Sequence, residues 1–292
     1  MEDSTLSQSP ERPPYLRVFL TFARNSLVRD MTFRLNFIIE SAAALSWMMA
    51  NLGFYLLIFT FTDSIGEKTG WGQYEFFIFL ATTMFVNSLV QAFFMPNAQE
   101  FSEMIRTGGL DFALLKPIDT QFLVSLQRVN WASFVNFLAG GILLAFSVSQ
   151  LAMREENPLQ LTPLIVILYP IFVVCGVAIL YSLMVSLAAT SIWLGRNQSL
   201  YDFWFYITNF SRYPMEIYSG TYGWPLRWFF TFIVPVLIVV NVPARIIAQP
   251  LRPDTSLGMA MGMFGIVATV LCLIVSRFIF CRSLLSYRSA SS

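Results

Sequence analysis

Long apolar runs recur along the whole chain and constrain its fold more than any other feature. A helix needs about 20 apolar residues to cross the roughly 30 Å hydrocarbon core of a bilayer. Of the 292 residues, 56% are hydrophobic and only 12% are charged, and no stretch has the composition of a second, water-soluble domain. The chain is therefore expected to be a single-domain, all-α membrane protein. The convincing spans are Leu35–Phe61, Phe76–Met95, Val129–Val148, Leu164–Leu194 and Leu257–Cys281.

Two further runs decide the number of crossings. Leu200–Tyr218 carries Pro214, and Leu226–Ile247 is interrupted by Pro235 and Pro243. Arginines before the first span and near the end of the last favour cytoplasmic termini, which require an even number of crossings. We therefore expect six spans, in which 200–218 crosses and 226–247 forms a re-entrant hairpin, because each proline removes a backbone donor and breaks the helix. Seven full spans with an exterior C-terminus are the alternative.

The segment before the first span is polar and basic. Residues 1–14 are expected to form a disordered cytoplasmic tail. In residues 15–33, apolar side chains recur at i, i+3 and i+4 spacing and arginines occupy the other face, a pattern typical of an amphipathic helix. Such a helix is too polar to cross, so we expect it to lie in the cytoplasmic headgroup layer with its arginines on membrane lipid. A plain start of the first span is the simpler alternative.

Residue types that usually carry chemistry are scarce. The chain has no His, its three cysteines lie in or at the ends of apolar runs, and its net charge of +1 provides no strong field for nucleic acid. A phosphate-binding loop needs G-x-x-x-x-G-K-[ST]. The nearest string, Gly66-Glu67-Lys68-Thr69, lacks the adjacent Gly-Lys pair. We therefore expect no catalytic residue, no metal site and no bound cofactor in this chain.

A polar segment at 97–118 separates the second and third spans. Residues 97–105 have helix-forming character, Gly108 and Gly109 end that helix, and 110–115 can form further turns before Pro117. The basic residues of the segment place it in the cytoplasm. We expect the span ends or a partner protein to cover its large apolar side chains. These are Phe101, Ile105, Leu110, Phe112 and Leu114.

Two stretches resemble the permease subunits of type-2 ABC exporters. The first runs Ile105-Arg-Thr-Gly-Gly-Leu-Asp-Phe-Ala-Leu-Leu-Lys-Pro117, and the second runs Ser211-Arg-Tyr-Pro-Met-Glu-Ile-Tyr218, followed by Pro235 and by Asn241-Val-Pro-Ala244. The resemblance covers nearly the whole chain. It implies an interfacial elbow helix, six spans, a cytoplasmic coupling helix within 97–118 and a re-entrant hairpin before the last span.

The resemblance also implies partners and roles. The coupling helix would insert into a separate ABC ATPase that binds ATP, and a second permease, identical or related, would complete the transporter. The location would be the inner (plasma) membrane of a bacterial cell, with both termini cytoplasmic. The residues implied for ATPase coupling are Glu100, Glu103, Ile105, Arg106, Gly108, Leu110, Asp111, Leu114, Lys116 and Pro117. Those implied for the hairpin are Arg212, Pro214, Pro235 and Pro243.

An ion-coupled secondary transporter is the alternative function. Such a transporter normally places acidic residues or broken helices near the bilayer midplane, and no acidic residue lies at the centre of a convincing span. Arg212 and Glu216 are four residues apart, and we predict a local ion pair between them at the break before the hairpin. The sequence favours an ATP-driven exporter permease whose ATP hydrolysis occurs on a separate subunit.

Overall fold

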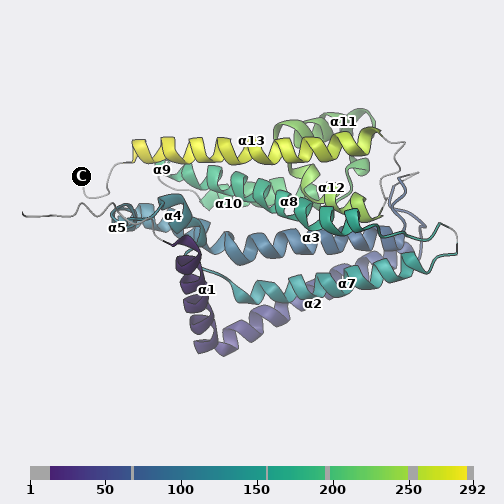
Figure 1. The fold of residues 1–292 in the computed structure, drawn as a ribbon, viewed down its shortest axis with the longest axis horizontal. Helices are drawn as coiled ribbons and strands as arrows, with labels where there is room; N and C mark the ends of the chain where they lie inside the picture. The colour runs from purple at the N-terminus through teal and green to yellow at the C-terminus, as the bar shows by residue number, and fades with distance from the viewer. Residues whose placement is uncertain (1–13, 67–68, 156, 195–197, 249–255, 288–292) are drawn as a thin grey trace, which may run out of the picture.

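The computed structural model describes residues 14–66, 69–155, 157–194, 198–248 and 256–287, and every regular element within these ranges is a helix (Figure 1). The expected all-α membrane fold is confirmed. The predicted tail, residues 1–14, lies outside the described residues apart from its last. Five helical stretches are long and apolar enough to cross a membrane, and they correspond to the five convincing runs. They are Arg34–Phe59, Gln73–Thr107, Trp131–Ala152, Pro163–Trp193 and Ala260–Ser286.

The N-terminal helix turns away from the direction of the spans. α1 (Tyr15–Thr32) is followed after one residue by α2 (Arg34–Phe59), and Figure 1 shows a sharp angle between them. The hydroxyl of Ser26 on α1 accepts a hydrogen bond from the backbone N–H of Val129 at 3.0 Å. This contact fixes α1 against the start of the third span. The helix predicted for 15–33 is therefore present, and its place in the headgroup layer stays a prediction.

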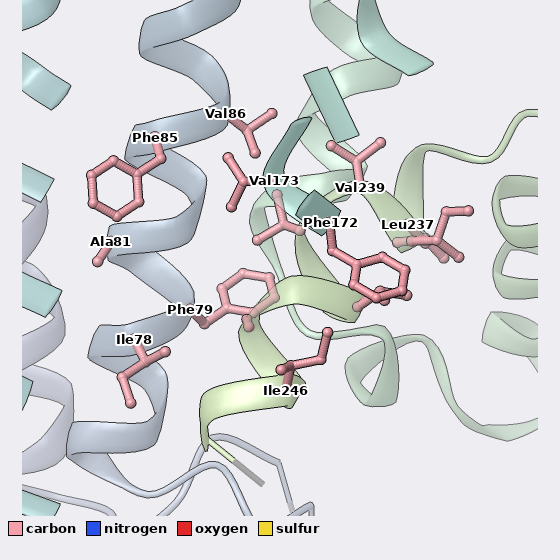
Figure 2. Close-up of a cluster of buried hydrophobic side chains, with 14 of the residues drawn as sticks. Ile78, Phe79, Ala81, Phe85, Val86, Phe172, Val173, Leu237, Val239 and Ile246 are labelled. Carbon is pink, nitrogen blue, oxygen red and sulfur yellow. The ribbon is translucent and has the colours of Figure 1, made fainter. Parts of the chain in front are cut away.

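Three helices build the centre of the fold. α12 (Val236–Ala248) packs against both α3 (Gln73–Phe93) and α8 (Pro163–Ala189). All of α12 is buried except Arg245, which is partly buried. Figure 2 shows the side chains that meet in this core. Among them are Phe79, Phe85 and Val86 of α3, Phe172 and Val173 of α8, and Leu237, Val239 and Ile246 of α12.

The other spans surround this centre. α7 (Phe134–Ala152), preceded by the short η1 (Trp131–Ser133), packs on α3, and α13 (Ser256–Ser286) packs on α8. α2 packs mainly on α7, and Tyr55 is its one buried residue. The rest of α2 presents apolar side chains outward. Because large exposed apolar surfaces mark contacts with lipid or protein, this face of α2 suits the bilayer or a second chain.

A glycine allows α8 and α12 to approach closely. A Cβ at Gly176 would lie 2.5 Å from the carbonyl oxygen of Val239. In a regular helix that carbonyl would accept a hydrogen bond from residue 243, but Pro243 has no N–H to donate. The sequence predicted a break at Pro243, and this was wrong: α12 continues through it. The Val239 carbonyl, which lacks its helical donor because of Pro243, packs against the backbone of Gly176, where there is no side chain.

The predicted span 200–218 is not one continuous helix. It is interrupted at Tyr213, whose φ of −124° and ψ of 148° are extended. The following Pro214 is the physical reason, because a proline disfavours helical backbone in the residue before it. Among the described residues, no helix in 200–218 is long enough to cross on its own. The pieces are α10 (Gln198–Asn209), η2 (Phe210–Arg212) and η3 (Met215–Tyr218), and the four-residue α9 (Ser191–Leu194) precedes them.

The segment that follows is bent sharply at the predicted proline. α11 (Gly220–Trp228) continues into a π-helical turn, η4 (Phe229–Ile233), and α12 begins after Pro235. The stretch 224–233 meets α12 at 88°. This is the geometry of a broken span or a re-entrant segment. The first arm begins earlier than the predicted Leu226.

Candidate functional site

A helix–glycine–helix unit lies at the end of the bundle opposite α11 (Figure 1). α4 (Met95–Thr107) ends at Gly108, whose φ of 73° is the left-handed conformation that favours glycine. α5 (Gly109–Leu114) follows at once. Pro117 then prevents the helix from continuing. Residues 95–117 are called the coupling element below.

One face of the coupling element packs into the protein's own core. Leu110 is fully buried, and Phe101 is 1% exposed. Both belong to a second buried cluster, formed with α6 (Thr120–Leu126) and with the adjacent ends of α8 and α13. The rings of Phe101 and Phe280 of α13 are 5.8 Å apart. This packing joins the coupling element to the ends of α8 and α13, and close-packed interiors transmit strain.

α5 and the residue after it also carry large apolar side chains that the described protein leaves uncovered. Phe112 is 73% exposed, Leu115 is 82% exposed and Leu114 is 41% exposed. These three residues are called the apolar tip. The sequence pattern predicts the same coupling role for Leu110 and Leu114, but only Leu110 is buried in the structure. Leu110 attaches the element to the bundle, and Leu114 lies on the exposed side.

The charged residues predicted for coupling are largely paired on the surface of α4. Glu100 forms an ion pair with Arg128 at 2.6 Å. Glu103 and Arg106 form an exposed ion pair one turn apart. Among the remaining predicted residues, Ile105 is partly buried, and Lys116 and Pro117 are exposed. The structure brings this set together on one element; their role in coupling stays a prediction.

Two polar contacts tie the same region to α13. Asp111 lies beside Tyr287, and burial, followed by the Asp111 charge, raises the pKa of Tyr287. Asp119, the N-cap of α6, accepts hydrogen bonds from the guanidinium of Arg277 at 3.1 and 2.6 Å and from the backbone N–H of Phe122 at 3.0 Å. Burial opposes the charged form of Asp119, but these hydrogen bonds outweigh it and lower the pKa of Asp119.

The predicted hairpin residues lie near a second polar cluster. The sequence predicted an ion pair between Glu216 and Arg212. In the structure, Glu216 instead forms an ion pair with Arg245 of α12. Glu216 also accepts a hydrogen bond from the indole N–H of Trp71 at 2.8 Å. The Arg245 guanidinium lies 5.7 Å from the centre of the Trp71 ring. The prediction was wrong because Pro214 interrupts the helix that would have placed Arg212 and Glu216 on one face.

Asn241 joins α12 to the break at Pro214. It is fully buried within an otherwise apolar helix. Its side-chain oxygen accepts a hydrogen bond from the backbone N–H of Met215 at 2.9 Å, and its amide donates to the carbonyl of Leu237 at 2.7 Å. Buried backbone donors need a partner, so Asn241 compensates for the helical hydrogen bonds that are lost at the break.

Comparison with known proteins identifies the family. The sequence model of the family described as "ABC-2 family transporter protein" matches residues 45–291, which is most of the chain. The chain belongs to the ABC-2 transporter family. It is therefore a permease subunit of an ABC transporter and a multi-pass membrane protein, with a transport role rather than a catalytic one. Searches of the curated proteins and of the solved structures give no match.

Three residues that hold this ABC-2 permease together were missing from the predicted set: Trp71, Asn241 and Arg245. A sequence signal existed for two of them, because Asn241 and Arg245 are polar residues inside an apolar run, where such residues are expensive unless partnered. Trp71 carried no such signal. The partners of all three lie far away in the sequence, and only the fold reveals them.

Proposed function

We propose that this permease is the membrane half of an ATP-driven exporter, and that its coupling element docks on a separate ABC ATPase. The apolar tip carries the proposal. It is exposed on an element whose other face is built into the ends of α8 and α13. A partner that covers the tip could therefore move these spans as it closes around ATP. The sequence itself contains no phosphate-binding loop, so ATP would bind on the partner.

The proposal fixes an orientation in the membrane. The coupling element would lie in the cytoplasm, together with the basic α1 and both termini, and the 88° bend before α12 would lie towards the exterior. The arginines that precede the first span support this orientation through the positive-inside rule. The host membrane would be the inner (plasma) membrane of a bacterial cell.

A second permease would complete the transporter. α2 buries a single residue and exposes large apolar side chains along its length. A face of this kind suits close contact with another membrane subunit or with lipid. An identical chain and a related chain both satisfy this requirement, so the proposal covers a homodimer and a heterodimer. Membrane lipid would cover the apolar surface that remains.

Docking is tested by placing charges on the apolar tip. The double substitution Phe112→Asp with Leu115→Asp should lower co-purification of the ATPase by about tenfold or more, because truncating central contacts of an interface costs about 2 kcal/mol or more. Both side chains are mostly exposed, so the yield and thermal stability of the permease should not change. Co-purification and ATPase stimulation in proteoliposomes are the measurements.

A matched control places the same two charges on exposed apolar residues elsewhere. Phe61 is 85% exposed and Met153 is 77% exposed, and both lie at the opposite ends of their helices from the coupling element. The pair Phe61→Asp with Met153→Asp should leave ATPase binding intact. Normal binding by the Phe112/Leu115 variant would contradict the docking proposal.

The ion-coupled alternative gains no support from the positions of the carboxylates. Glu75, at the start of α3, pairs with Arg154 at 2.9 Å, and Glu216 pairs with Arg245. A proton- or sodium-coupling carboxylate needs to exchange its ion during transport. An arginine partner opposes this by stabilising the charged carboxylate. The ATP-driven permease therefore remains the function that the geometry supports best.

A further inference from the structure

A pocket of about 140 Å³ lies between α2, α3, α7 and η2. Four of its lining residues on α3, at positions 80, 83, 87 and 91, follow the three- and four-residue spacing of one helix face. The second half of α3, nearer α4, contributes three of the polar lining residues, Asn87, Ser88 and Gln91. We call this space the polar pocket. Its principal polar lining residues are Asn51, Asn87, Ser88, Gln91, Asn136 and Arg212.

The polar pocket contains hydrogen-bonding capacity that the described protein does not use. The side-chain oxygen of Asn136 is buried and has no hydrogen-bond partner among the described residues. Two further carboxamides, those of Asn87 and Gln91, line the same space. A polar group buried in a membrane protein without a hydrogen-bond partner is strongly unfavourable, because no water is present to pair with it. A polar occupant of the pocket would remove that cost.

Arg212 gives the pocket a positive charge. Its guanidinium lies 5.5 Å from the centre of the Phe205 ring, and among the described residues it forms no ion pair. The residues that line the pocket include no Asp or Glu. A cation inside a membrane protein normally pairs with an opposite charge or marks a ligand pathway. The charge of the pocket therefore favours an anionic occupant.

The shape of the pocket favours entry from the side of the coupling element. At the opposite end, aromatic rings close the space between α2 and α3. The ring centres of Tyr55 and Phe76 are 4.6 Å apart, and those of Phe59 and Phe77 are 6.1 Å apart. Towards α1 the two helices separate, as Figure 1 shows. Gln91, at this wider end, is exposed. Under the proposed function, the wide end is the cytoplasmic end.

We propose that the polar pocket binds the oxyanion head of an amphiphilic substrate. This inference rests on the proposed transport function and names the substrate class. Arg212 pairs with the head, and the carboxamides of Asn87 and Asn136 hydrogen-bond to its oxygens and to adjacent polar groups. The volume admits a head group and not a whole lipid. The apolar tail lies along the exposed part of α2 beside the pocket, where Trp47 is 68% exposed.

The test measures binding to the permease alone, so it does not depend on the ATPase. The full-length protein is placed in nanodiscs of phosphatidylcholine and titrated with two probes that share a tail, dansyl-labelled dodecanoate and dansyl-labelled dodecyltrimethylammonium. The carboxylate probe should bind about tenfold more tightly, because only its head group can accept charge-assisted hydrogen bonds from Arg212. Dansyl fluorescence, excited by energy transfer from tryptophans such as Trp47, reports binding.

Three substitutions define the site. Arg212→Gln should remove the preference for the carboxylate probe, Arg212→Lys should keep most of it, and Asn136→Leu should weaken the carboxylate probe about threefold or more. Arg227→Gln is the matched control, because Arg227 lies on α11 and does not line the pocket. It should bind both probes like the unmodified protein. Size-exclusion profiles verify folding, and Asn136→Leu retains the test if the Arg212→Gln variant does not fold.

Adding phosphatidylglycerol to the nanodiscs identifies the source of the oxyanion. Displacement of the carboxylate probe assigns the pocket to an anionic membrane lipid, and binding without displacement assigns it to another anionic amphiphile. Equal binding of the two probes, tighter binding of the cationic probe, or an unchanged preference in Arg212→Gln would overturn the proposal. These outcomes leave ATPase docking untouched, and the Phe112/Leu115 variant tests docking separately.

Discussion

Two of the helix breaks among the described residues, at Gly108 and at Pro235, have opposite surroundings. At Gly108, α4 gives way to α5, and the apolar tip beyond the break stays exposed. At Pro235, η4 gives way to α12, and the helix beyond the break is buried at the centre of the bundle. Both segments are short and rich in large apolar residues. The presence of a break therefore does not determine whether the following helix becomes surface or core.

Charge content accounts for the difference. The coupling element carries Glu100, Glu103, Arg106, Asp111 and Lys116 within 17 residues, whereas α12 carries Arg245 alone. Burying a charge in hydrocarbon costs at least about 2.5 to 3.5 kcal/mol on insertion scales. An element with five charges stays at the aqueous boundary even when one of its faces packs. An element with one paired charge can occupy the centre, where it determines the positions of α3 and α8.

The largest expected effect comes from placing a side chain at Gly176, where α8 and α12 are in close contact. Gly176→Val should destabilise the protein by about 3 kcal/mol or more, because overpacking a well-packed core costs about 1 to 3 kcal/mol and here the nearest atom is a backbone oxygen. A Cβ at Gly176 would meet that oxygen, of Val239, at 2.5 Å. Thermal unfolding in detergent is the measurement.

A second glycine supplies the control for this substitution. Gly141 also lies within a span, α7, and a Cβ there would meet nothing within 4 Å. Gly141→Val should therefore change stability by less than about 1 kcal/mol, a range typical of open helical sites. Equal losses for the two variants would show that α12 is not the close-packed centre, and the contrast between the two breaks would no longer hold.

A smaller effect is expected when the polar anchor of α12 is removed. Asn241→Leu should cost about 1 to 3 kcal/mol, because it leaves the backbone N–H of Met215 buried without its acceptor. Asn51→Leu is the control. The Asn51 amide donates only to the Trp47 carbonyl of its own helix, so its loss leaves no buried donor unpaired. A loss for Asn241→Leu no larger than that for the control would mean that the break at Pro214 needs no side-chain acceptor.

Much of the fold followed from local features of the sequence. Apolar length predicted the five long spans, and Gly108 and Pro235 marked the two breaks, because the rules that govern spans and helix breaks act over one or a few turns. Pro243 was an exception, because the rule for prolines predicted a helix break there and α12 continues through it. Its missing hydrogen bond is tolerated because the Val239 carbonyl packs against Gly176, 63 residues away by the difference of their numbers. Such a contact exists only in the folded bundle.

The candidate site was predictable as a segment but not residue by residue. The pattern of 97–118 placed large apolar side chains among charges, yet it could not tell which face would pack. In the structure Leu110 is buried, whereas Phe112, two residues later in the sequence, is exposed. The pairing of Glu216 was mistaken for the same reason. Spacing suggested Arg212, and the fold supplied Arg245 from a different helix.

The smallest expected effect contrasts the pH dependence of two polar contacts, one just after the coupling element and one on α12. Just after the coupling element, Asp119 pairs with Arg277 and caps α6. Asp119→Asn keeps a capping side chain and removes the charge. Because the Asp119 side chain is 35% exposed, solvent screening should limit the loss of stability near neutral pH to about 0.5 kcal/mol.

The direction of the pH effect follows from the lowered pKa of Asp119. A lowered pKa contributes stability that is fully present above the unfolded value of about 3.9 and is lost as the pH falls through the folded value. The difference in Tm between Asp119→Asn and the unmodified protein should therefore stay constant from about pH 7 to about pH 5 and shrink as the pH falls further to about 3. The penalty for Asn241→Leu should persist across that range, because neither Asn241 nor the backbone N–H of Met215 titrates there. A difference for Asp119→Asn that stays constant with pH would mean that capping, and not the ion pair with α13, holds the end of the coupling element.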